Sequence, residues 1–258
     1  MYCGIDLGSR SVKIVLMSPD GGREYYQFDT ISFYREHGRL QEGELTVDLA
    51  ALLPAGRRPA VVVSTGYGRQ TVALKGARSV PEIKAHVRGA VFETGRRDFT
   101  LLDLGGQDSK VALVRDGRMV DFQTNDRCAA STGRYLENMA AVLGIGLEEL
   151  GRHYRDPVEL TSTCAIFGET ELIGRVVEGY PLKALAAGVN YTIFKRLRPM
   201  LMRLASEVVV FTGGVAQNEA LRHILADELA VEVVVPEHPQ FTGALGCCLI
   251  AREGDGGR

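Results

Sequence analysis

Apolar and polar residues along the chain follow two periods, one typical of strands and one typical of helices. Short runs rich in β-branched residues predict strands at 2–5, 14–17, 60–64, 99–102, 111–114, 208–211 and 231–235. Apolar residues three or four positions apart predict helices near 83–94, 138–150, 164–177, 182–204, 218–229 and 243–251. Because strands and helices alternate, we expect an α/β fold. The segment 20–58 carries no motif that predicts a function.

One polar pattern occurs twice, each time between two predicted strands. The copies read Asp6-Leu7-Gly8-Ser9-Arg10-Ser11-Val12-Lys13 and Asp103-Leu104-Gly105-Gly106-Gln107-Asp108-Ser109-Lys110. Their Asp, Leu, Gly and Lys recur at one constant offset, which indicates an internal repeat. Two ordinary β-hairpins would have the same outline. The matched polar residues instead favour two phosphate-binding hairpins, which we call hairpin 1 (6–13) and hairpin 2 (103–110).

The residue types in these hairpins suit a polyphosphate. Glycine lacks a Cβ, so its backbone can approach an anion closely, and successive N–H groups form a concave anion site. Lys13 and Lys110 can add donors to the phosphate oxygens. Asp6 and Asp103 end their strands, where we expect them to hold Mg²⁺ directly or through water. Two such hairpins facing each other would grip one nucleotide.

A third glycine turn follows another predicted strand, in Phe211-Thr212-Gly213-Gly214-Val215-Ala216-Gln217-Asn218. The turn opens a predicted helix, whose positive end favours a phosphate or a flat ring nearby. Taken alone, it is also typical of a plain strand-to-helix connection. Together with the two hairpins, it predicts the adenosine wall of a cleft.

Composition and charge exclude several classes of protein. The chain has 258 residues, of which 45% are hydrophobic and 24% charged, and a formal net charge of −2. The sequence has no dense tract of Lys and Arg of the kind that binds nucleic acid. No segment approaches the roughly 18 apolar residues of a membrane span, and no signal-peptide pattern opens the chain. We therefore expect no nucleic acid, no membrane and a cytoplasmic location. The histidines, His86 among them, show no ligand spacing and are expected to be solvated.

The repeat predicts two domains. The first covers 1–97 and contains hairpin 1. The second covers 98–242 and contains hairpin 2, the Gly-Gly turn and two of the cysteines. A last helix, at about 243–258, could pack back on the first domain. The run Arg96-Arg97-Asp98 is typical of a short hinge between them.

The five cysteines fall into two groups. Cys3, Cys247 and Cys248 lie in apolar patterns and are expected to be small core residues. Cys128 and Cys164 each begin a segment predicted to be helical, where a thiol is stabilised as the thiolate that ligates metals. Two thiolates cannot complete a four-thiolate iron–sulfur site, but a two-fold dimer would supply the other two. The spacing matches no standard zinc motif, so a structural or redox-inert role also stays open on these grounds.

The segments around these two cysteines carry a family resemblance. They read NDRCAASTGRYLE (125–137) and STCAIFGETE (162–171). With the runs at 65–69, 105–110, 213–218 and 240–246, they resemble the ATP-dependent activator, component A, of 2-hydroxyacyl-CoA dehydratases. That family includes the ATPase subunits of benzoyl-CoA reductase and belongs to the superfamily of sugar kinases, heat-shock chaperones and actin. Two departures are Ser131, where the family pattern has Gly, and Cys247-Cys248, where small residues are usual.

The resemblance implies an ATPase coupled to electron transfer. Two RNase H-like domains would close on Mg-ATP in a cleft between them. A homodimer would share one [4Fe–4S] cluster, ligated by Cys128 and Cys164 of each copy. After reduction by ferredoxin or flavodoxin, it would pass a single low-potential electron to a partner 2-hydroxyacyl-CoA dehydratase or a related iron–sulfur reductase.

The same assignment gives each hairpin residue a role. Asp6 and Asp103 would hold Mg²⁺. One side of the phosphates would be lined by Ser9, Arg10, Ser11, Val12 and Lys13, and the other by Gly105, Gly106 and Gln107. The nucleoside would contact Gly213, Gly214, Gln217 and Gln240. The candidate catalytic residues are Gln107, which would position the attacking water, Asp103 as the alternative for that role, and Asp6.

Other functions of the same outline stay open. A sugar-kinase-like phosphotransferase would need an acceptor pocket with a carboxylate base. A chaperone or filament ATPase would not require Cys128 and Cys164. A non-enzymatic dimer bridged by four cysteines would bind structural zinc. An ATPase subunit of an aromatic-ring reductase would differ only in its acceptor.

Overall fold

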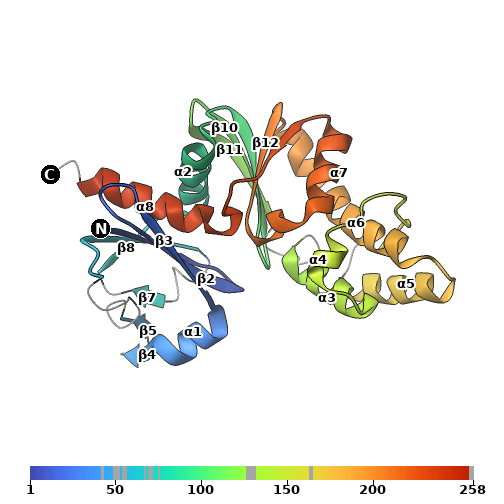
Figure 1. Ribbon diagram of the computed structural model, residues 1–258, viewed down its shortest axis with the longest axis horizontal. Coiled ribbons are helices and arrows are strands. Elements are labelled where there is room, and N and C mark those ends of the chain that lie inside the picture. Colours follow the sequence, from blue (N-terminus) through green and yellow to red (C-terminus); the bar gives the residue numbers. More distant parts are fainter. Residues whose placement is uncertain are drawn as a thin grey trace. The chain divides into compact units, whose positions relative to one another are not determined.

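The chain folds into two compact units. The computed structural model describes residues 1–41, 44–48, 53, 57–66, 68, 72–74, 76–125, 132–162 and 165–255. Unit 1 consists of Met1–Arg97 together with Pro236–Arg258, and unit 2 is the uninterrupted stretch Asp98–Val235 (Figure 1). The chain therefore passes from one unit to the other twice.

A five-stranded sheet forms the centre of unit 1. Its strands are β1 (Tyr2–Leu7), β2 (Ser11–Met17), β3 (Arg23–Asp29), β6 (Val61–Thr65) and β8 (Ala77–Ser79), in the order β3-β2-β1-β6-β8. The first three are antiparallel neighbours, whereas β6 and β8 run parallel to β1. Almost every side chain of β1 and β2 is buried, which explains the continuous apolar runs that predicted these strands.

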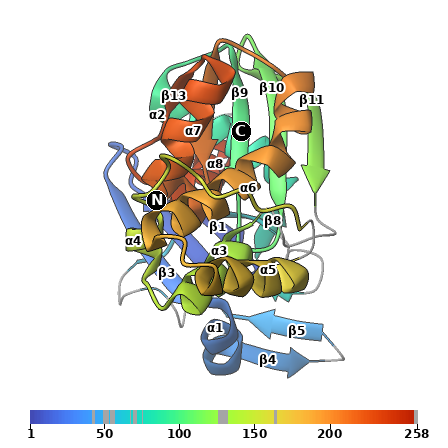
Figure 2. The same cartoon turned by 90° about the vertical axis from the view of Figure 1, so that its right-hand side faces the viewer.

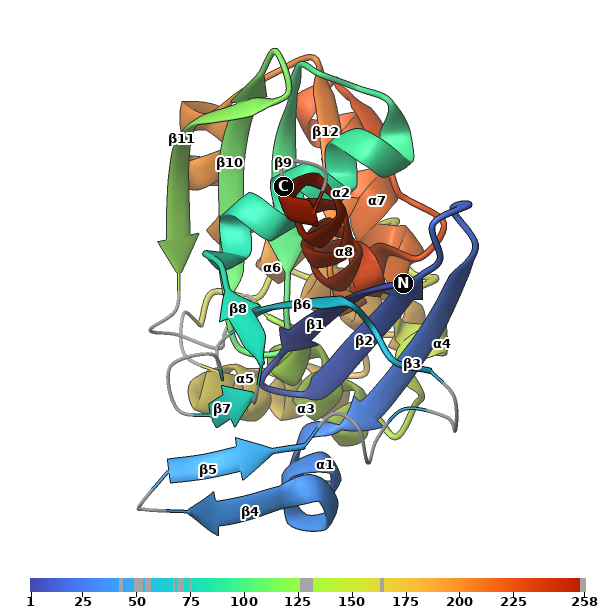
Figure 3. The ribbon, with the colours of Figure 1, turned by 90° about the vertical axis from the view of Figure 1, so that its left-hand side faces the viewer.

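Helix α8 (Thr242–Asp255) packs on this sheet, and α2 (Glu82–Thr94) packs on α8. Helix α8 contacts α2 along its length and also lies against β1 and β6 (Figure 3). Glycines allow this close approach. A Cβ on Gly4 would lie 1.9 Å from the carbonyl oxygen of Ala244, and one on Gly246 would lie 1.8 Å from that of Ala85. The Gly-rich run at 240–246 therefore serves tight packing of helix on helix and helix on strand.

The part of the segment 20–58 that follows β3 forms a small subassembly within unit 1. It contains α1 (Thr30–His37), β4 (Gly38–Gln41) and β5 (Glu44–Val47), and β5 pairs with β7 (Val72–Leu74) to give a sheet in the order β4-β5-β7. Asp29 caps α1 by accepting a hydrogen bond of 3.0 Å from the Ser32 N–H. Phe33 of α1 is buried and joins the core beneath β1 and β2.

The sheet of unit 2 repeats that of unit 1. Its strands are β9 (Phe99–Leu104), β10 (Ser109–Arg115), β11 (Arg118–Asn125), β12 (Val208–Thr212) and β13 (Glu232–Val234), in the order β11-β10-β9-β12-β13. Three antiparallel neighbours are again followed by two strands parallel to the first of them. The repeat thus extends from the hairpins to whole sheets, and the expected α/β class is confirmed.

The helices of unit 2 supply its core. They are α3 (Gly133–Leu143), α4 (Leu147–Leu150), α5 (Ala165–Val177), α6 (Leu182–Arg203), the 3₁₀ turn η4 (Gly214–Gln217) and α7 (Glu219–Leu229). Another 3₁₀ turn, η5 (Pro239–Phe241), precedes α8 in unit 1. Helices α6 and α7 pack together in front of the sheet (Figure 2). Ile193 and Leu197 of α6 share one apolar cluster with Leu102 and Phe211 of the strands. No helix among the described residues is long and apolar enough to span a membrane.

The helix predicted at 138–150 is wrong at both ends. Helix α3 begins at Gly133 and ends at Leu143, and α4 is a separate short turn. Gly144 adopts a φ of 69°, and the Ile145 N–H donates a 3.0 Å hydrogen bond back to Ala140, which closes the helix end. Apolar spacing could not show this break, because the leucines of α4 continue the same period.

Candidate functional site

Each sheet carries one hairpin of the repeat at the same place. In unit 1 the pairing of β1 with β2 sets Asp6 opposite Lys13, and in unit 2 the pairing of β9 with β10 sets Asp103 opposite Lys110. Lys13 Nζ lies 3.9 Å from Asp6 Oδ2, and Lys110 Nζ lies 4.0 Å from Asp103 Oδ2. Both carboxylates are nearly fully buried. The constant offset in the sequence therefore corresponds to one geometry made twice.

The first glycine of each hairpin turn has little space beside its Cα. A Cβ on Gly8 would lie 2.7 Å from the carbonyl oxygen of Ser11, and a Cβ on Gly105 would lie 2.7 Å from Asp108 Oδ1. The same Asp108 accepts a hydrogen bond of 2.5 Å from Lys110 Nζ. Glycine is thus needed in hairpin 1, where the clash would be with backbone, whereas in hairpin 2 a Cβ would fit if the Asp108 side chain turned away.

The amino end of α3 binds the turn of hairpin 2. The Gly133 N–H donates to the carbonyl oxygen of Gly105 at 3.0 Å, and the Arg134 N–H donates to that of Gly106 at 3.1 Å. In the part of the chain that the structure describes, the backbone N–H groups of Gly106 and Gln107 have no hydrogen-bond partner. Two successive unpaired N–H groups are a ready donor pair for a phosphate oxygen.

A Thr-Gly pair ends the strand next to each hairpin. Thr65 of β6 pairs with the aspartate of hairpin 1, and Thr212 of β12 pairs with the aspartate of hairpin 2. The following Gly66 and Gly213 have φ values of +96° and +86°. A Cβ on them would lie 2.5 and 2.9 Å from Oδ1 of the respective aspartates. The structure therefore shows that Thr65-Gly66 is the counterpart of Thr212-Gly213, an equivalence that the sequence reasoning missed.

The two threonines bond differently. Thr212 Oγ1 donates to Asp103 Oδ1 at 3.1 Å, whereas Thr65 Oγ1 donates to the carbonyl oxygen of Val80 at 3.0 Å. Asp6 Oδ1 is consequently buried without a hydrogen-bond partner among the described residues. A buried carboxylate oxygen without a donor suits a hard cation such as Mg²⁺. Asp6 therefore fits the role of a metal ligand.

The structure contradicts the expectation that His86 is solvated. Its side chain, on α2, is buried, and its Nε2 lies 3.9 Å from Asp6 Oδ2. Gly243 at the start of α8 leaves room for the ring, since a Cβ there would lie 2.5 Å from the same nitrogen. His86 is a site residue that the sequence reasoning missed, because it fits no ligand spacing and its neighbours are distant along the chain.

The predicted nucleoside residues divide between the units. Gly213, Gly214 and Gln217 connect β12 through η4 to α7, whose first turn is capped by the Asn218 side chain. Gly214 and Gln217 are exposed at this turn. Gln240 lies in η5 of unit 1, and its Oε1 is buried without a hydrogen-bond partner among the described residues.

The other predicted site residues follow the same division. Unit 1 carries Asp6, Ser9, Arg10, Ser11, Val12, Lys13 and Gln240, and unit 2 carries Asp103, Gly105, Gly106, Gln107, Gly213, Gly214 and Gln217. Each set is gathered at the strand ends of its own sheet, apart from Gln240 in η5.

The cysteines of the two groups differ in what the structure describes. Cys128 and Cys164 lie outside the described residues. Cys3, Cys247 and Cys248 are fully buried, which confirms them as core residues. Burial raises the pKa of the Cys3 thiol to about 12 and also raises the pKa of the other two. These three thiols therefore stay protonated and unreactive.

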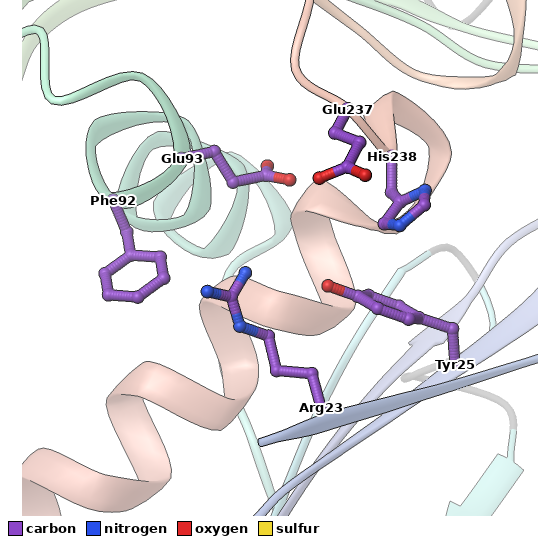
Figure 4. Close-up of a pocket in the computed structure, with 6 residues that line it drawn as sticks. All are labelled: Arg23, Tyr25, Phe92, Glu93, Glu237 and His238. Atoms are coloured by element: carbon purple, nitrogen blue, oxygen red, sulfur yellow. The ribbon is translucent and has the colours of Figure 1, made fainter. Parts of the chain in front are cut away.

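A pocket of about 270 Å³ lies within unit 1 and contains none of the predicted site residues. It is lined by Arg23, Tyr25, Phe92, Glu93, Glu237 and His238 (Figure 4). The carboxylates of Glu93 and Glu237 face each other across it. Burial raises the pKa of Glu93 to about 7, although the Thr242 hydroxyl, which donates to it at 2.8 Å, works in the opposite direction.

Comparison with known proteins gives the family. The sequence pattern of the BadF/BadG/BcrA/BcrD ATPase family matches residues 3–251. The 2-hydroxyisocaproyl-CoA dehydratase activator of Clostridioides difficile is 34% identical over 254 residues, which cover 96% of this chain and 93% of that protein. The (R)-2-hydroxyglutaryl-CoA dehydratase activating ATPase of Acidaminococcus fermentans is 38% identical over 196 residues, covering 74% and 75% of the two chains.

The fold is similar to that of a solved activator. The activator of the 2-hydroxyisocaproyl-CoA dehydratase from Clostridium difficile with bound ADPNP superposes with a TM-score of 0.83 at 29% identity, over 100% of this chain and 97% of that one. This similarity confirms the expected class of paired RNase H-like domains, and the sequence relatives confirm the resemblance to dehydratase activators. The chain belongs to the BadF/BadG/BcrA/BcrD ATPase family.

Proposed function

We propose that this chain is an ATP-hydrolysing iron–sulfur activator that passes single low-potential electrons to a partner enzyme. Membership of an ATPase family supports nucleotide hydrolysis. Relatives named as activators of 2-hydroxyacyl-CoA dehydratases support a dehydratase as the partner. In each cycle ferredoxin or flavodoxin would lose one electron and the acceptor would gain it, while ATP and water become ADP and phosphate.

The doubled hairpin geometry is the observation that carries the nucleotide site. Each unit supplies a buried aspartate, a lysine opposite it and a Thr-Gly turn in close approach. In this assignment Asp6 and Asp103 hold Mg²⁺ or orient its waters, and the free N–H groups of Gly106 and Gln107 bind a phosphate oxygen. The exposed Gln107 side chain would position the attacking water, and the nucleoside would rest on Gly213, Gly214, Gln217 and Gln240.

ATP would drive an uphill electron transfer by population shift. A nucleotide changes the balance between two conformations only if it binds them with different affinity. Residues from both units contribute to the proposed site, so a change in their arrangement would change that affinity. The hydrolysis step then returns the protein to the conformation that accepts the next electron.

The chemistry of the donor set supports the iron–sulfur assignment. Cys128 and Cys164 from two copies give four thiolates, the number that a [4Fe–4S] cluster takes. When bound, such a cluster supplies a one-electron carrier. The other three cysteines are buried in the core of unit 1, so they are not available as ligands. The ligand count therefore calls for a homodimer.

The metal content of protein purified without oxygen tests this assignment. We expect about four irons per dimer and a broad absorption at about 400 nm. Cys128→Ala and Cys164→Ala should each lose the iron while still binding ADP, and Cys247→Ala, the control in the core, should keep it. A colourless wild-type protein with one zinc per dimer would contradict the proposal and favour a structural bridge.

The acceptor is tested by ATP-dependent reduction of candidate partners. Reduced ferredoxin, ATP and the activator should reduce a 2-hydroxyacyl-CoA dehydratase, with no reduction when ATP is omitted. Reduction of an aromatic-ring reductase instead would assign the chain to that acceptor class. Phosphoryl transfer to a sugar without any electron transfer would contradict the proposal.

A further inference from the structure

The carboxylate of Glu171 binds the chain segment that leads to Cys164. The Thr161 backbone N–H donates to both carboxylate oxygens, at 2.8 and 3.0 Å, and the Thr161 hydroxyl donates to Oε1 at 3.0 Å. The Ser162 N–H donates to Oε2 at 2.8 Å. Because Glu171 belongs to α5, this helix holds the segment that precedes it through a charged side chain.

Arg196 of α6 binds the same segment through the backbone carbonyl group of Ser162. Its Nη2 donates to the carbonyl oxygen of Ser162 at 2.7 Å. The guanidinium carbon also lies 4.9 Å from the centre of the Tyr135 ring, which is fully buried in α3. Stacking on a fixed ring orients the planar guanidinium. Both the N–H and the C=O of Ser162 are thus held, by side chains from two different helices.

The contact made by Glu171 differs from an ordinary helix cap in the position of its side chain along the helix. A cap uses a short side chain at the helix start to bind N–H groups of the first turn. Glu171 lies in the second turn of α5 and binds N–H groups of residues that precede the helix. Its bonds therefore fix the approaching segment rather than the first turn.

Charge strengthens the contact. Burial acts to raise the pKa of Glu171, but the hydrogen bonds from Thr161 and Ser162 outweigh it, so the pKa is lowered from its ordinary value. The group is then ionised at neutral pH, and hydrogen bonds to an ionised acceptor are shorter and stronger than neutral ones.

We infer that Glu171 and Arg196 are positioning residues for Cys164, and this inference rests on the proposed function, in which Cys164 is a cluster ligand. Cys164 follows Ser162 by two residues and directly precedes α5. Groups that orient a ligand without touching the metal typically change metal affinity by about 10- to 100-fold when they are lost. The two side chains would therefore set both the retention of the cluster and its electronic surroundings.

Glu171→Gln in the dimer purified without oxygen tests the inference. The amide keeps one acceptor oxygen but turns an NH₂ group toward a backbone N–H, so the segment loses part of its anchoring. We expect iron release to a chelator to be about tenfold faster than in the wild type, and the electron paramagnetic resonance spectrum of the reduced cluster to change. ADP binding should stay at the wild-type level.

Glu178→Gln is the matched control. Glu178 directly follows α5 and pairs at 2.9 Å with Arg175, remote in sequence from the anchored segment. Its iron release and spectrum should match those of the wild type.

Arg196→Met provides a second variant, and it decides the test if Glu171→Gln does not fold. It should also speed iron release, and Arg196→Lys should restore only part of the loss because lysine lacks the planar fork. Wild-type iron release and spectrum in both Glu171→Gln and Arg196→Met would overturn the inference and leave the proposed function intact. Wild-type protein without iron would instead overturn the proposed function, and the inference with it.

Discussion

The hydroxyl of Thr212 donates a hydrogen bond of 3.1 Å to Oδ1 of Asp103. Its counterpart Thr65 donates to a backbone carbonyl instead, and in unit 1 the space beside Asp6 is occupied by the buried imidazole of His86. The two halves of the repeat therefore support equivalent carboxylates with different side chains. This difference leads to two predictions about the proposed Mg²⁺ site.

Thr212→Val should lower kcat for ATP hydrolysis about tenfold. A hydrogen bond to a charged acceptor contributes roughly 1.5–3 kcal/mol, and without it Asp103 loses a fixed orientation. Steady-state hydrolysis at saturating ATP measures the effect. Thr192→Val is the control, because that hydroxyl is also buried but donates to the Gly188 carbonyl within α6. Equal rates in both variants would show that Asp103 needs no support from Thr212.

His86→Ala should weaken Mn²⁺ binding in the presence of ADP by about tenfold. The imidazole packs against Asp6, so its removal frees the carboxylate to turn, whereas ADP affinity measured without metal should not change. Titration followed by electron paramagnetic resonance of free Mn²⁺ gives the affinity. His223→Ala, in which an exposed ring stacked on Tyr154 is removed, serves as the control. Wild-type Mn²⁺ affinity in His86→Ala would show that His86 only packs against Asp6 and does not orient it for metal binding.

Gly246→Ala should destabilise the protein by about 3 kcal/mol. The added Cβ would lie 1.8 Å from the Ala85 carbonyl oxygen, so α8 must move away from α2. Gly174→Ala is the matched control, since Gly174 is also helical but has open space around it. That variant should be more stable than the wild type by roughly 0.5–1 kcal/mol. Chemical denaturation measures both changes, and a similar stability for the two variants would contradict the packing described.

Glu93→Gln should remove part of the pH dependence of stability. The pKa of Glu93 is raised from 4.5 to about 7 in the folded protein. Between these values the folded state binds the proton that the unfolded state has lost, so the free energy of unfolding falls as the pH rises. The fall is on the order of 3 kcal/mol and is complete above about pH 7.

Denaturation curves at pH 5 and pH 8 check this prediction. The difference between the two pH values should be smaller in Glu93→Gln than in the wild type. Glu237→Gln should instead move the fall in the free energy of unfolding to lower pH. The Glu237 carboxylate faces Glu93 and raises the pKa of Glu93, so its loss lowers that pKa. The same difference in Glu93→Gln and the wild type would contradict a raised pKa.

The sequence predicts the buried central strands of both sheets well. Strands β1, β2, β9 and β10 have continuous buried faces, so their apolar runs show where they lie, and the repeated Asp and Lys fix their register. The edge strand β11 was missed for the opposite reason. Most of its side chains are exposed, so no alternation of apolar and polar residues marks it.

The candidate site was predictable where local geometry dictates residue type. Gly8 is needed by a tight turn, and such a turn can be recognised in a sequence. His86 and Arg196 could not be found in this way, because their partners Asp6 and Ser162 are far along the chain and meet them only through packing of α2 and α6. Pairings of this kind leave no periodic or spaced signal.

The contact between β1 and α8 has a consequence for how the protein is made. On the ribosome, the uninterrupted stretch Asp98–Val235 emerges whole and can complete its sheet while later residues are still being added. The sheet that carries Asp6 must wait for α8, which emerges only after unit 2, and until then Val15 and Met17 of β2 lack their apolar partners on that helix. Nascent chains stalled before residue 242 should therefore be substrates for chaperones, because unit 2 can fold while the sheet of unit 1 still lacks α8.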